Sequence, residues 1–311
     1  MENKCLYCYS PIEKGLYFHK KCSLNFFGEY PAPSIEYTLN QMSELAKNVV
    51  ERSISIPGVQ PKLSMSLIKE NTDKRLTVVG ALGGQYIFKP PSDKFKEMPE
   101  NEHLTMRIAE SFSIRVVPSS LIRLASGELS YITRRIDRTN DGNKIHMIDM
   151  FQITEAFDKY KSSTEKIGKA INSYSDNTLL DKIFYFEIVV FSFLTGNNDM
   201  HLKNFSMIES ASGWTLSPAY DLLNVTVIFP DDTEELALSL AGKRKKLKRQ
   251  HFEQLGKVLG LNNKQITGTF KRFSVNKHKA MEWIEKSFLS TDMKIAYKEL
   301  IEKRYRQIEL S

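Results

Sequence analysis

Residues 196–223 read GNNDMHLKNFSMIESASGWTLSPAYDLL, and this stretch indicates how the surrounding chain folds. Residues 203–208 and 214–217 are short runs with strand-like composition, and residues 209–213 between them are typical of a turn. This pattern predicts an antiparallel hairpin. If Ile208 pairs with Trp214, the open end of the hairpin brings Asp221 beside His201.

The polar residues at that open end have the spacing of a phosphotransfer site. Asp199 and Asn204 are five residues apart, as in a kinase catalytic loop, where the acid orients a hydroxyl and the amide ligates a metal. Asp221 adds a second carboxylate, and Mg²⁺ requires only a few hard oxygen ligands besides phosphate oxygens. The alternative is a polar loop in which Asp199 and Asp221 cap backbone groups.

A second set of polar residues lies upstream. Residues 53–62 read SISIPGVQPK, and runs typical of strands follow at 63–68, 76–79 and 86–89. Small and polar residues in the first run allow backbone N–H groups to approach phosphate oxygens. Lys89 ends an apolar strand, where a lysine can pair with phosphates. It is also a common position for a surface lysine.

Glu102 is a candidate partner for Lys89. Pro99 is suited to the start of a helix, and Glu102 then lies on the edge of its apolar face. That face consists of Leu104, Ile108 and Phe112. Glu102 can therefore face a lysine on a neighbouring sheet, although a glutamate in a first helical turn is also favoured by the helix dipole.

Six motifs occur in one order along the chain. They are SISIPGVQPK (53–62), YIFKP (86–90), ENE (100–102), RRID (134–137), GNNDMHLKNFS (196–206) and SPAYDLL (217–223). In these motifs the chain resembles the HipA-like serine/threonine kinases of bacterial toxin-antitoxin systems, from about Glu36 onward. The resemblance implies a kinase that transfers the γ-phosphate of ATP to a protein hydroxyl.

The resemblance also implies a role for each motif residue. Asp199 is the expected catalytic acid/base, with His201 and Lys203 positioning the catalytic loop and balancing its charge. Asn204 and Asp221 are the expected Mg²⁺ ligands. The expected ATP-binding residues are Ser55, Gly58, Val59, Gln60, Lys62, Lys89, Glu102, Arg134, Ile136, His201, Asn204 and Asp221, with the backbone near Arg134 and Ile136 as the adenine hinge.

Within this family the chain is most similar to the short HipT form, because only some 35 residues precede Glu36. That similarity implies autophosphorylation at one or both of Ser53 and Ser55. It also implies a HipB-like DNA-binding antitoxin, a separate small HipS-like protein, and an aminoacyl-tRNA synthetase as substrate. DNA contact is expected only through the antitoxin.

The distribution of patterns predicts an α+β, two-lobed, protein-kinase-like fold, with a small β-containing N-lobe, a larger helical C-lobe and ATP in the cleft between them. The predicted domains are a short Cys/His-containing segment (1–35), the N-lobe with the phosphate-binding loop (36–137) and the C-lobe with the catalytic loop (138–311). The predicted C-lobe helices are 179–195, 250–259, 264–288 and 292–308.

Composition agrees with one enzyme of this size, since the chain has 311 residues and is 41% hydrophobic. The longest apolar run, 183–194, contains Glu187 and predicts a buried helix rather than a membrane span. The N-terminus lacks the apolar core of a signal peptide. These features predict a cytoplasmic protein with no membrane partner.

All three cysteines lie near the N-terminus, as Cys5, Cys8 and Cys22, with His19 among them. Three thiolates and one imidazole can hold a structural Zn²⁺. The alternative is that the aromatic residues of this segment dock it without metal. Disulfides are not expected in a reducing cytoplasm.

A basic run, 243–249, contributes to the net charge of +7. It either touches nucleic acid or is a solvated surface, and the lack of interleaved aromatic residues favours the second interpretation.

Besides a protein kinase, the fold and the triad of Asp199, Asn204 and Asp221 leave two other functions open. One is a small-molecule phosphotransferase, and the other is a non-catalytic co-repressor that only binds an antitoxin.

Overall fold

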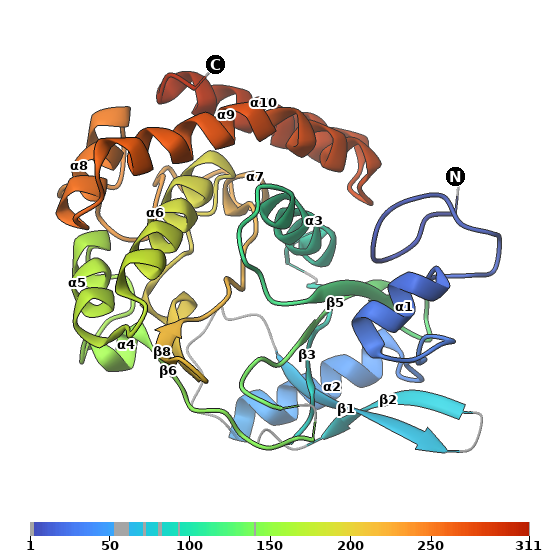
Figure 1. Ribbon diagram of the computed structural model, residues 1–311. Helices are drawn as coiled ribbons and strands as arrows, with labels where there is room; N and C mark the ends of the chain where they lie inside the picture. Colours follow the sequence, from blue (N-terminus) through green and yellow to red (C-terminus); the bar gives the residue numbers. More distant parts are fainter. Residues whose placement is uncertain are drawn as a thin grey trace. The chain divides into compact units, whose positions relative to one another are not determined.

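The structure, a computed structural model, describes residues 3–52, 62–70, 73–79, 83–92, 94–139 and 141–310 (Figure 1). These residues form two compact units. The first comprises the described residues within Met1–His103, Val117–Asn143 and Lys286–Phe288, and the second comprises those within Leu104–Val116, Lys144–Glu285 and Leu289–Ser311. Both strands and helices occur, which confirms the predicted α+β class.

The first unit is built on an antiparallel five-stranded sheet with the order β2-β1-β3-β5-β4 (Figure 1). Its strands are β1 (Leu63–Glu70), β2 (Asp73–Val79), β3 (Tyr86–Lys89), β4 (Ser119–Arg123) and β5 (Leu129–Arg134). Leu63 and Met65 of β1 are buried on the same face, as the two-residue period of a strand requires. The three strands predicted before residue 90 are confirmed.

Three helices contribute to the first unit, namely α1 (Lys20–Phe27), α2 (Leu39–Arg52) and the start of α3 (Met98–Ser111). Helix α3 begins one residue before Pro99, close to the predicted start. Leu104 and Ile108 are fully buried, and Phe112, just beyond the helix, is 2% exposed. The predicted apolar stripe is therefore confirmed, and it fixes which side of α3 carries Glu102.

The second unit is mostly helical. Its elements are β6 (Met147–Asp149), α4 (Met150–Ile153), α5 (Thr164–Tyr174), α6 (Thr178–Leu194), the 3₁₀-helix η1 (Leu202–Asn204), β7 (Ser206–Ser210), β8 (Gly213–Leu216), α7 (Val225–Ile228), α8 (Arg249–Val258), α9 (Asn263–Lys286) and α10 (Thr291–Gln307), together with the rest of α3. The four helices predicted in this region occur within one or two residues of the predicted bounds.

Helix α6 is the centre of the second unit because every residue from Phe184 to Leu194 is buried. It packs against α5, α8 and α10, and Phe186 lies edge-on to Phe270 of α9 at 5.9 Å. Glu187 is balanced by Arg272, whose Nη2 lies 2.7 Å from Glu187 Oε1. The predicted buried helix is confirmed, and among the described residues no helix has the length and hydropathy needed to cross a bilayer.

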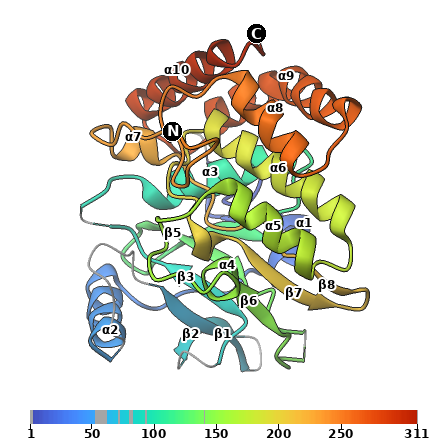
Figure 2. The same ribbon diagram turned by 90° about the vertical axis from the view of Figure 1, so that its left-hand side faces the viewer.

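The hairpin that contains β7 and β8 differs in detail from the prediction. β6, β7 and β8 form a three-stranded sheet beside α5 (Figure 2). Ile208 pairs with Thr215, not with Trp214, because the turn is shorter than predicted and Ser210 pairs with Gly213. The first strand starts at Ser206 rather than at residue 203, since residues 202–204 form η1.

Candidate active site

A glycine turn at the end of α6 begins the loop that carries Asp199. Gly196 has a φ of 69°, and a Cβ there would lie 2.4 Å from Leu300 Cδ2 and 2.8 Å from Asn224 Oδ1. Its carbonyl oxygen accepts hydrogen bonds of 3.1 Å from both the backbone N–H and the hydroxyl of Thr226. Only glycine satisfies this conformation in this space, so the direction of the loop is fixed at its first residue.

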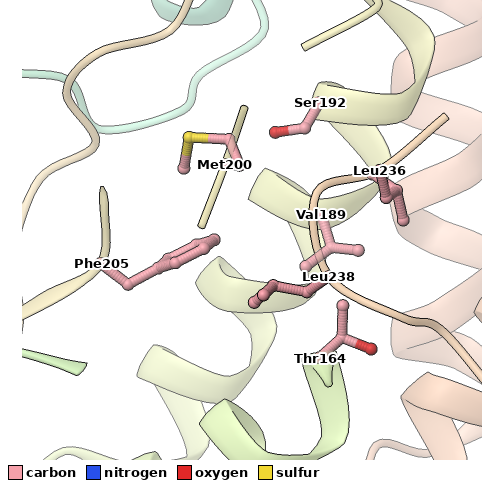
Figure 3. A pocket seen from close by; sticks show the side chains of 7 residues that line it. All are labelled: Thr164, Val189, Ser192, Met200, Phe205, Leu236 and Leu238. Carbon is pink, nitrogen blue, oxygen red and sulfur yellow. The ribbon is translucent and has the colours of Figure 1, made fainter. Parts of the chain in front are cut away.

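Two apolar side chains of the loop anchor it to the core. Figure 3 shows the Phe205 ring pointing toward Val189 of α6 and Leu238, and Met200 and Leu236 also line this small hollow. This hollow measures about 10 Å³, which is at most the space of one water molecule. It is a packing gap beneath the loop and not a substrate pocket.

Asp199 combines an exposed carboxylate with a fixed backbone. Its side chain is 41% exposed, and Oδ1 accepts a hydrogen bond of 2.7 Å from the Tyr160 hydroxyl. Its carbonyl oxygen accepts hydrogen bonds of 2.8 Å from the backbone N–H of His201 and from Asn204 Nδ2. The carboxylate is therefore oriented and still open to a reacting group.

The side-chain orientation of Asn204 follows from its hydrogen bond. Because the Asp199 carbonyl can only accept, the Asn204 amide must turn its NH₂ group toward it. The amide oxygen is then the atom available to a ligand, and no described residue donates to it. Amide and carboxylate oxygens are the hard ligands that Mg²⁺ takes from proteins, so Asn204 presents an atom of the expected type, and the pairing with Asp221 as metal ligands stays a prediction.

His201 differs from the expectation in one respect. Burial lowers its pKa to about 4, against the charges of Asp199 and Asp221, which raise it. The imidazole is neutral near pH 7 and cannot balance charge, as had been expected of it. Its Nε2 lies 4.0 Å from Asp199 Oδ1, and its ring meets the Tyr160 ring edge-on at 5.1 Å. The predicted role of His201 in positioning the loop stays a prediction.

Asp221 lies on a segment tied to the same loop. It adopts a φ of 55°, a left-handed conformation that aspartate tolerates better than most residues. The neighbouring Tyr220 hydroxyl lies 2.5 Å from Ser206 Oγ and donates to the carbonyl oxygen of Lys203 at 3.1 Å. The effect of the Asp221 charge on the pKa of His201 agrees with the expected proximity of the two residues.

The Lys203 side chain contacts an aromatic ring of α4. Its Nζ lies 4.8 Å from the centre of the Phe151 ring, a cation–π contact. The ring belongs to α4, which also contacts η1. Lys203 therefore helps attach η1 to α4.

Tyr160 is a site residue that the sequence reasoning missed. It donates to Asp199, and its own carbonyl oxygen accepts a hydrogen bond from Arg244. Burial and the Asp199 carboxylate raise its pKa, which keeps the hydroxyl protonated as a donor. Tyr160 lies in an irregular segment far from Asp199 in sequence, and neither spacing nor periodicity marked it.

In the first unit, Lys89 and Glu102 meet as predicted. Lys89 Nζ lies 2.5 Å from Glu102 Oε1, and the two side chains are 5% and 2% exposed. The lysine also lies 5.2 Å from the centre of the Tyr131 ring on β5. The end of β3 and the first turns of α3 therefore hold a buried cation in one position.

The expected hinge residues Arg134 and Ile136 line a hollow of about 740 Å³ within the first unit, with Leu67, Tyr86 and Pro118. Lys62 precedes β1 and is exposed. The other predicted residues of the phosphate-binding loop and the predicted autophosphorylation sites, namely Ser53, Ser55, Gly58, Val59 and Gln60, lie outside the described residues.

The N-terminal Cys5, Cys8, His19 and Cys22 come together in the first unit. Their ligand atoms all lie within 4.8 Å of one another. Hydrogen bonding to Cys5 lowers the pKa of the Cys8 thiol, and the same hydrogen bond and burial raise the pKa of Cys5.

The basic run at 243–249 leads into α8 of the second unit. Arg244 and Lys245 donate hydrogen bonds to Glu234 and Thr233 of the same unit.

Two curated proteins illustrate what this chain is similar to. The protein Y4dM of Sinorhizobium fredii is 31% identical over 259 residues, which cover 78% of this chain and 62% of that protein. The serine/threonine-protein kinase toxin HipA of Shewanella oneidensis is 24% identical over 208 residues, which cover 60% of this chain and 46% of the toxin. The chain thus spans about half the length of these curated relatives.

Among solved structures, the fold matches a chain in the complex of HipA, HipB and operator DNA from Shewanella oneidensis. The TM-score is 0.68 at 21% identity, over 84% of this chain and 70% of the other. The predicted kinase-like fold is thereby confirmed. The family model for the HipA-like C-terminal domain matches residues 54–283, which is well over half of the sequence. The chain therefore belongs to the HipA-like C-terminal domain family.

Proposed function

We propose that this chain is an ATP-dependent serine/threonine protein kinase of a toxin-antitoxin system. The observation that carries the proposal is the geometry around Asp199, where an exposed, oriented carboxylate is joined through its backbone to the amide of Asn204. A decayed, purely structural loop would not need the Tyr160 hydroxyl aimed at an exposed acid. The same geometry disfavours a co-repressor without catalytic activity.

In the proposed reaction, Asp199 orients a serine or threonine hydroxyl of a protein substrate and accepts its proton. The hydroxyl oxygen bonds to the γ-phosphorus of ATP as the bond from that phosphorus to the β,γ-bridging oxygen breaks, and ADP leaves. Magnesium, when bound, would neutralise phosphate charge, and Asn204 and Asp221 supply the oxygen atoms suited to it. Tyr160 and the neutral His201 keep the acid in position.

The residues of the first unit have a complementary role in this proposal. Lys89 would contact phosphate oxygens, and Glu102 holds its ammonium group in place at 2.5 Å. Arg134 and Ile136 would supply backbone groups to the adenine. Residues 55–62 would bind phosphates, and one or both of Ser53 and Ser55 would be autophosphorylated.

The partners follow from the same proposal. The structural relative forms a complex with HipB and operator DNA, and we infer a HipB-like antitoxin for this chain, with DNA contacted through it. An aminoacyl-tRNA synthetase is the inferred substrate, a HipS-like protein is an inferred additional partner, and the short HipT form is the inferred subtype.

The test distinguishes the proposed role of Asp199 from that of Asp221. Asp199→Asn should lower the rate of phosphate transfer from labelled ATP to protein by about 100-fold to 10,000-fold, because the proton acceptor is lost. Its affinity for Mg-ATP, measured by calorimetry, should change little. Asp221→Asn should lose Mg-ATP binding as well, because a metal ligand is removed.

Asp231→Asn, at an exposed position, is the matched control and should behave as wild type. Equal Mg-ATP affinity in the Asp199 and Asp221 variants would contradict the assigned roles. Label transferred only to small molecules in a cell lysate, and not to protein bands, would contradict the substrate class.

A further inference from the structure

We infer that Cys5, Cys8, His19 and Cys22 form a closed structural zinc site that fixes the N-terminal segment, Asn3–Gly28, to the sheet of the first unit. This inference goes beyond the proposed kinase activity and does not depend on it. It rests on the local backbone, the orientation of the histidine, the donor atoms and the packing of the segment.

The first two cysteines lie in a tight hairpin. Lys4 and Pro11 form an antiparallel bridge, and the N–H of Cys5 donates to the Ser10 carbonyl oxygen at 2.9 Å. The N–H of Tyr9 donates back to the Cys5 carbonyl oxygen at 2.9 Å, and Tyr9 has a φ of 62°. A non-glycine residue in this conformation is uncommon, and here it turns the chain so that the Cys5 and Cys8 sulfurs lie on one side.

The other two donors come from the start of α1. His19 is the N-cap of this helix, yet its side chain makes no capping hydrogen bond. Its Nε2 lies 3.0 Å from the carbonyl oxygen of Pro11, which can only accept, so Nε2 carries the proton. Nδ1 then presents its lone pair toward Cys8 Sγ at 3.5 Å and Cys22 Sγ at 3.9 Å.

This arrangement has the features of a metal site. Metal-bound histidines usually donate their other ring N–H to a carbonyl or carboxylate, which fixes the tautomer. A tetrahedral zinc ion with bonds of about 2.0–2.3 Å sets its donor atoms about 3.5–4 Å apart, and the separations from His19 Nδ1 agree with this spacing. Four protein donors leave no open position, so the site is structural rather than catalytic.

The residues around the cluster connect it to the sheet and to α3. Tyr9 follows Cys8, and its hydroxyl lies 2.8 Å from Nδ1 of His103, the residue after Glu102. Phe26 and Phe27, at the end of α1, lie 5.9 Å and 6.1 Å from the Tyr86 ring of β3. The N–H of Leu121 on β4 donates to the Leu6 carbonyl oxygen at 3.3 Å.

Zinc would therefore stabilise more than the segment itself. A segment of this length has too small a core to fold alone, and a metal supplies the missing constraint. Among the residues that the segment contacts are Tyr86, three residues before Lys89, and His103, adjacent to Glu102. The zinc site thus supports both elements that carry the buried ion pair.

The first experiment measures metal in the wild-type chain, purified without added zinc. Elemental analysis should find about one zinc ion per chain. Mercurial titration of the thiols should release zinc in step with modification of the three cysteines. Well under one equivalent of zinc, another metal in its place, or release that does not follow thiol modification would overturn the inference.

Variants provide a second test. Cys22→Ser and His19→Asn should each lower zinc content, whereas Lys21→Gln, an exposed neighbour in the same helix, should retain it. Replacement of zinc by cobalt should give the visible absorption of tetrahedral cobalt thiolate, and this readout needs no kinase activity. Unchanged zinc content in a folded double variant, Cys22→Ser with His19→Asn, would contradict the site.

The supporting role is tested by hydrogen exchange. Removal of zinc by a chelator should increase amide exchange in β3 and in the first turns of α3, while α8 in the second unit serves as the internal reference. Unchanged exchange at Tyr86–Lys89 after complete metal removal would show that the site does not support this region.

Discussion

The proposed activity depends on two charged groups, Lys89 and Asp199, and their surroundings differ in burial and in the charge of the neighbouring group. Lys89 is buried and paired with Glu102 at 2.5 Å, whereas Asp199 is 41% exposed and its carboxylate accepts a hydrogen bond from the neutral Tyr160. A buried charge needs an opposite charge to offset its desolvation. An exposed charge needs only orientation.

The difference suits the two roles. A lysine that contacts phosphate must keep its charge in a fixed place, and a buried carboxylate achieves this. A general base must be free to accept a proton, and a cation beside it would oppose that proton transfer.

The largest effect on stability is expected from Lys89→Met. This change leaves Glu102 buried without its cation, which typically costs about 3–5 kcal/mol. Denaturant unfolding should show this loss, and the double variant Lys89→Met with Glu102→Gln should recover most of it because no uncompensated charge remains. Lys169→Met, at an exposed position of α5, is the control. A single variant as stable as wild type would show that the pair is not the constraint described here.

The second effect is a pH dependence from His201. The pKa of the imidazole is about 4 in the folded protein, against an ordinary value of 6.5. Between these pH values the unfolded chain binds a proton at His201 and the folded chain does not. The neutral His201 therefore contributes to stability in full above pH 6.5, and this contribution is lost as the pH falls toward 4. The loss lowers the free energy of unfolding by up to about 3 kcal/mol.

Unfolding of wild type and His201→Gln should be compared at several pH values between these limits, with the exposed His278→Gln as control. The His201 variant should lose less stability on acidification than wild type does. Parallel curves for the two proteins would mean that His201 is not held neutral by the folded loop.

The smallest effect is expected from Tyr160→Phe. This variant removes the hydrogen bond to Asp199 and keeps the aromatic contact with His201. It should lower kcat by about 10-fold, because a hydrogen bond to a charged acceptor contributes about 1.5–3 kcal/mol, of which only part acts on the rate. KM for ATP should stay near the wild-type value.

Tyr174→Phe, at an exposed position of α5, controls for loss of a hydroxyl elsewhere. An equal fall in activity in both variants, or a rise in KM for ATP without a change in kcat, would remove Tyr160 from the positioning of Asp199.

Much of this molecule was predictable from local patterns. Helix α6 followed from a continuous apolar run, the strands before residue 90 from their composition and the turns between them, and the Lys89–Glu102 contact from the face of α3 on which Glu102 lies. The predicted register of the β7–β8 hairpin differs from the observed one by one residue. An error of one residue in the length of the turn shifts every cross-strand pair.

The sequence alone determined the elements and the chemical groups, since periodicity and spacing depend only on neighbours along the chain. Tertiary structure alone decided contacts that no spacing predicted, such as those of Tyr160 with Asp199 and of Pro11 with His19. It also decided the charge of His201, because a pKa depends on burial and on nearby charges. These properties arise from packing, and no local pattern encodes them.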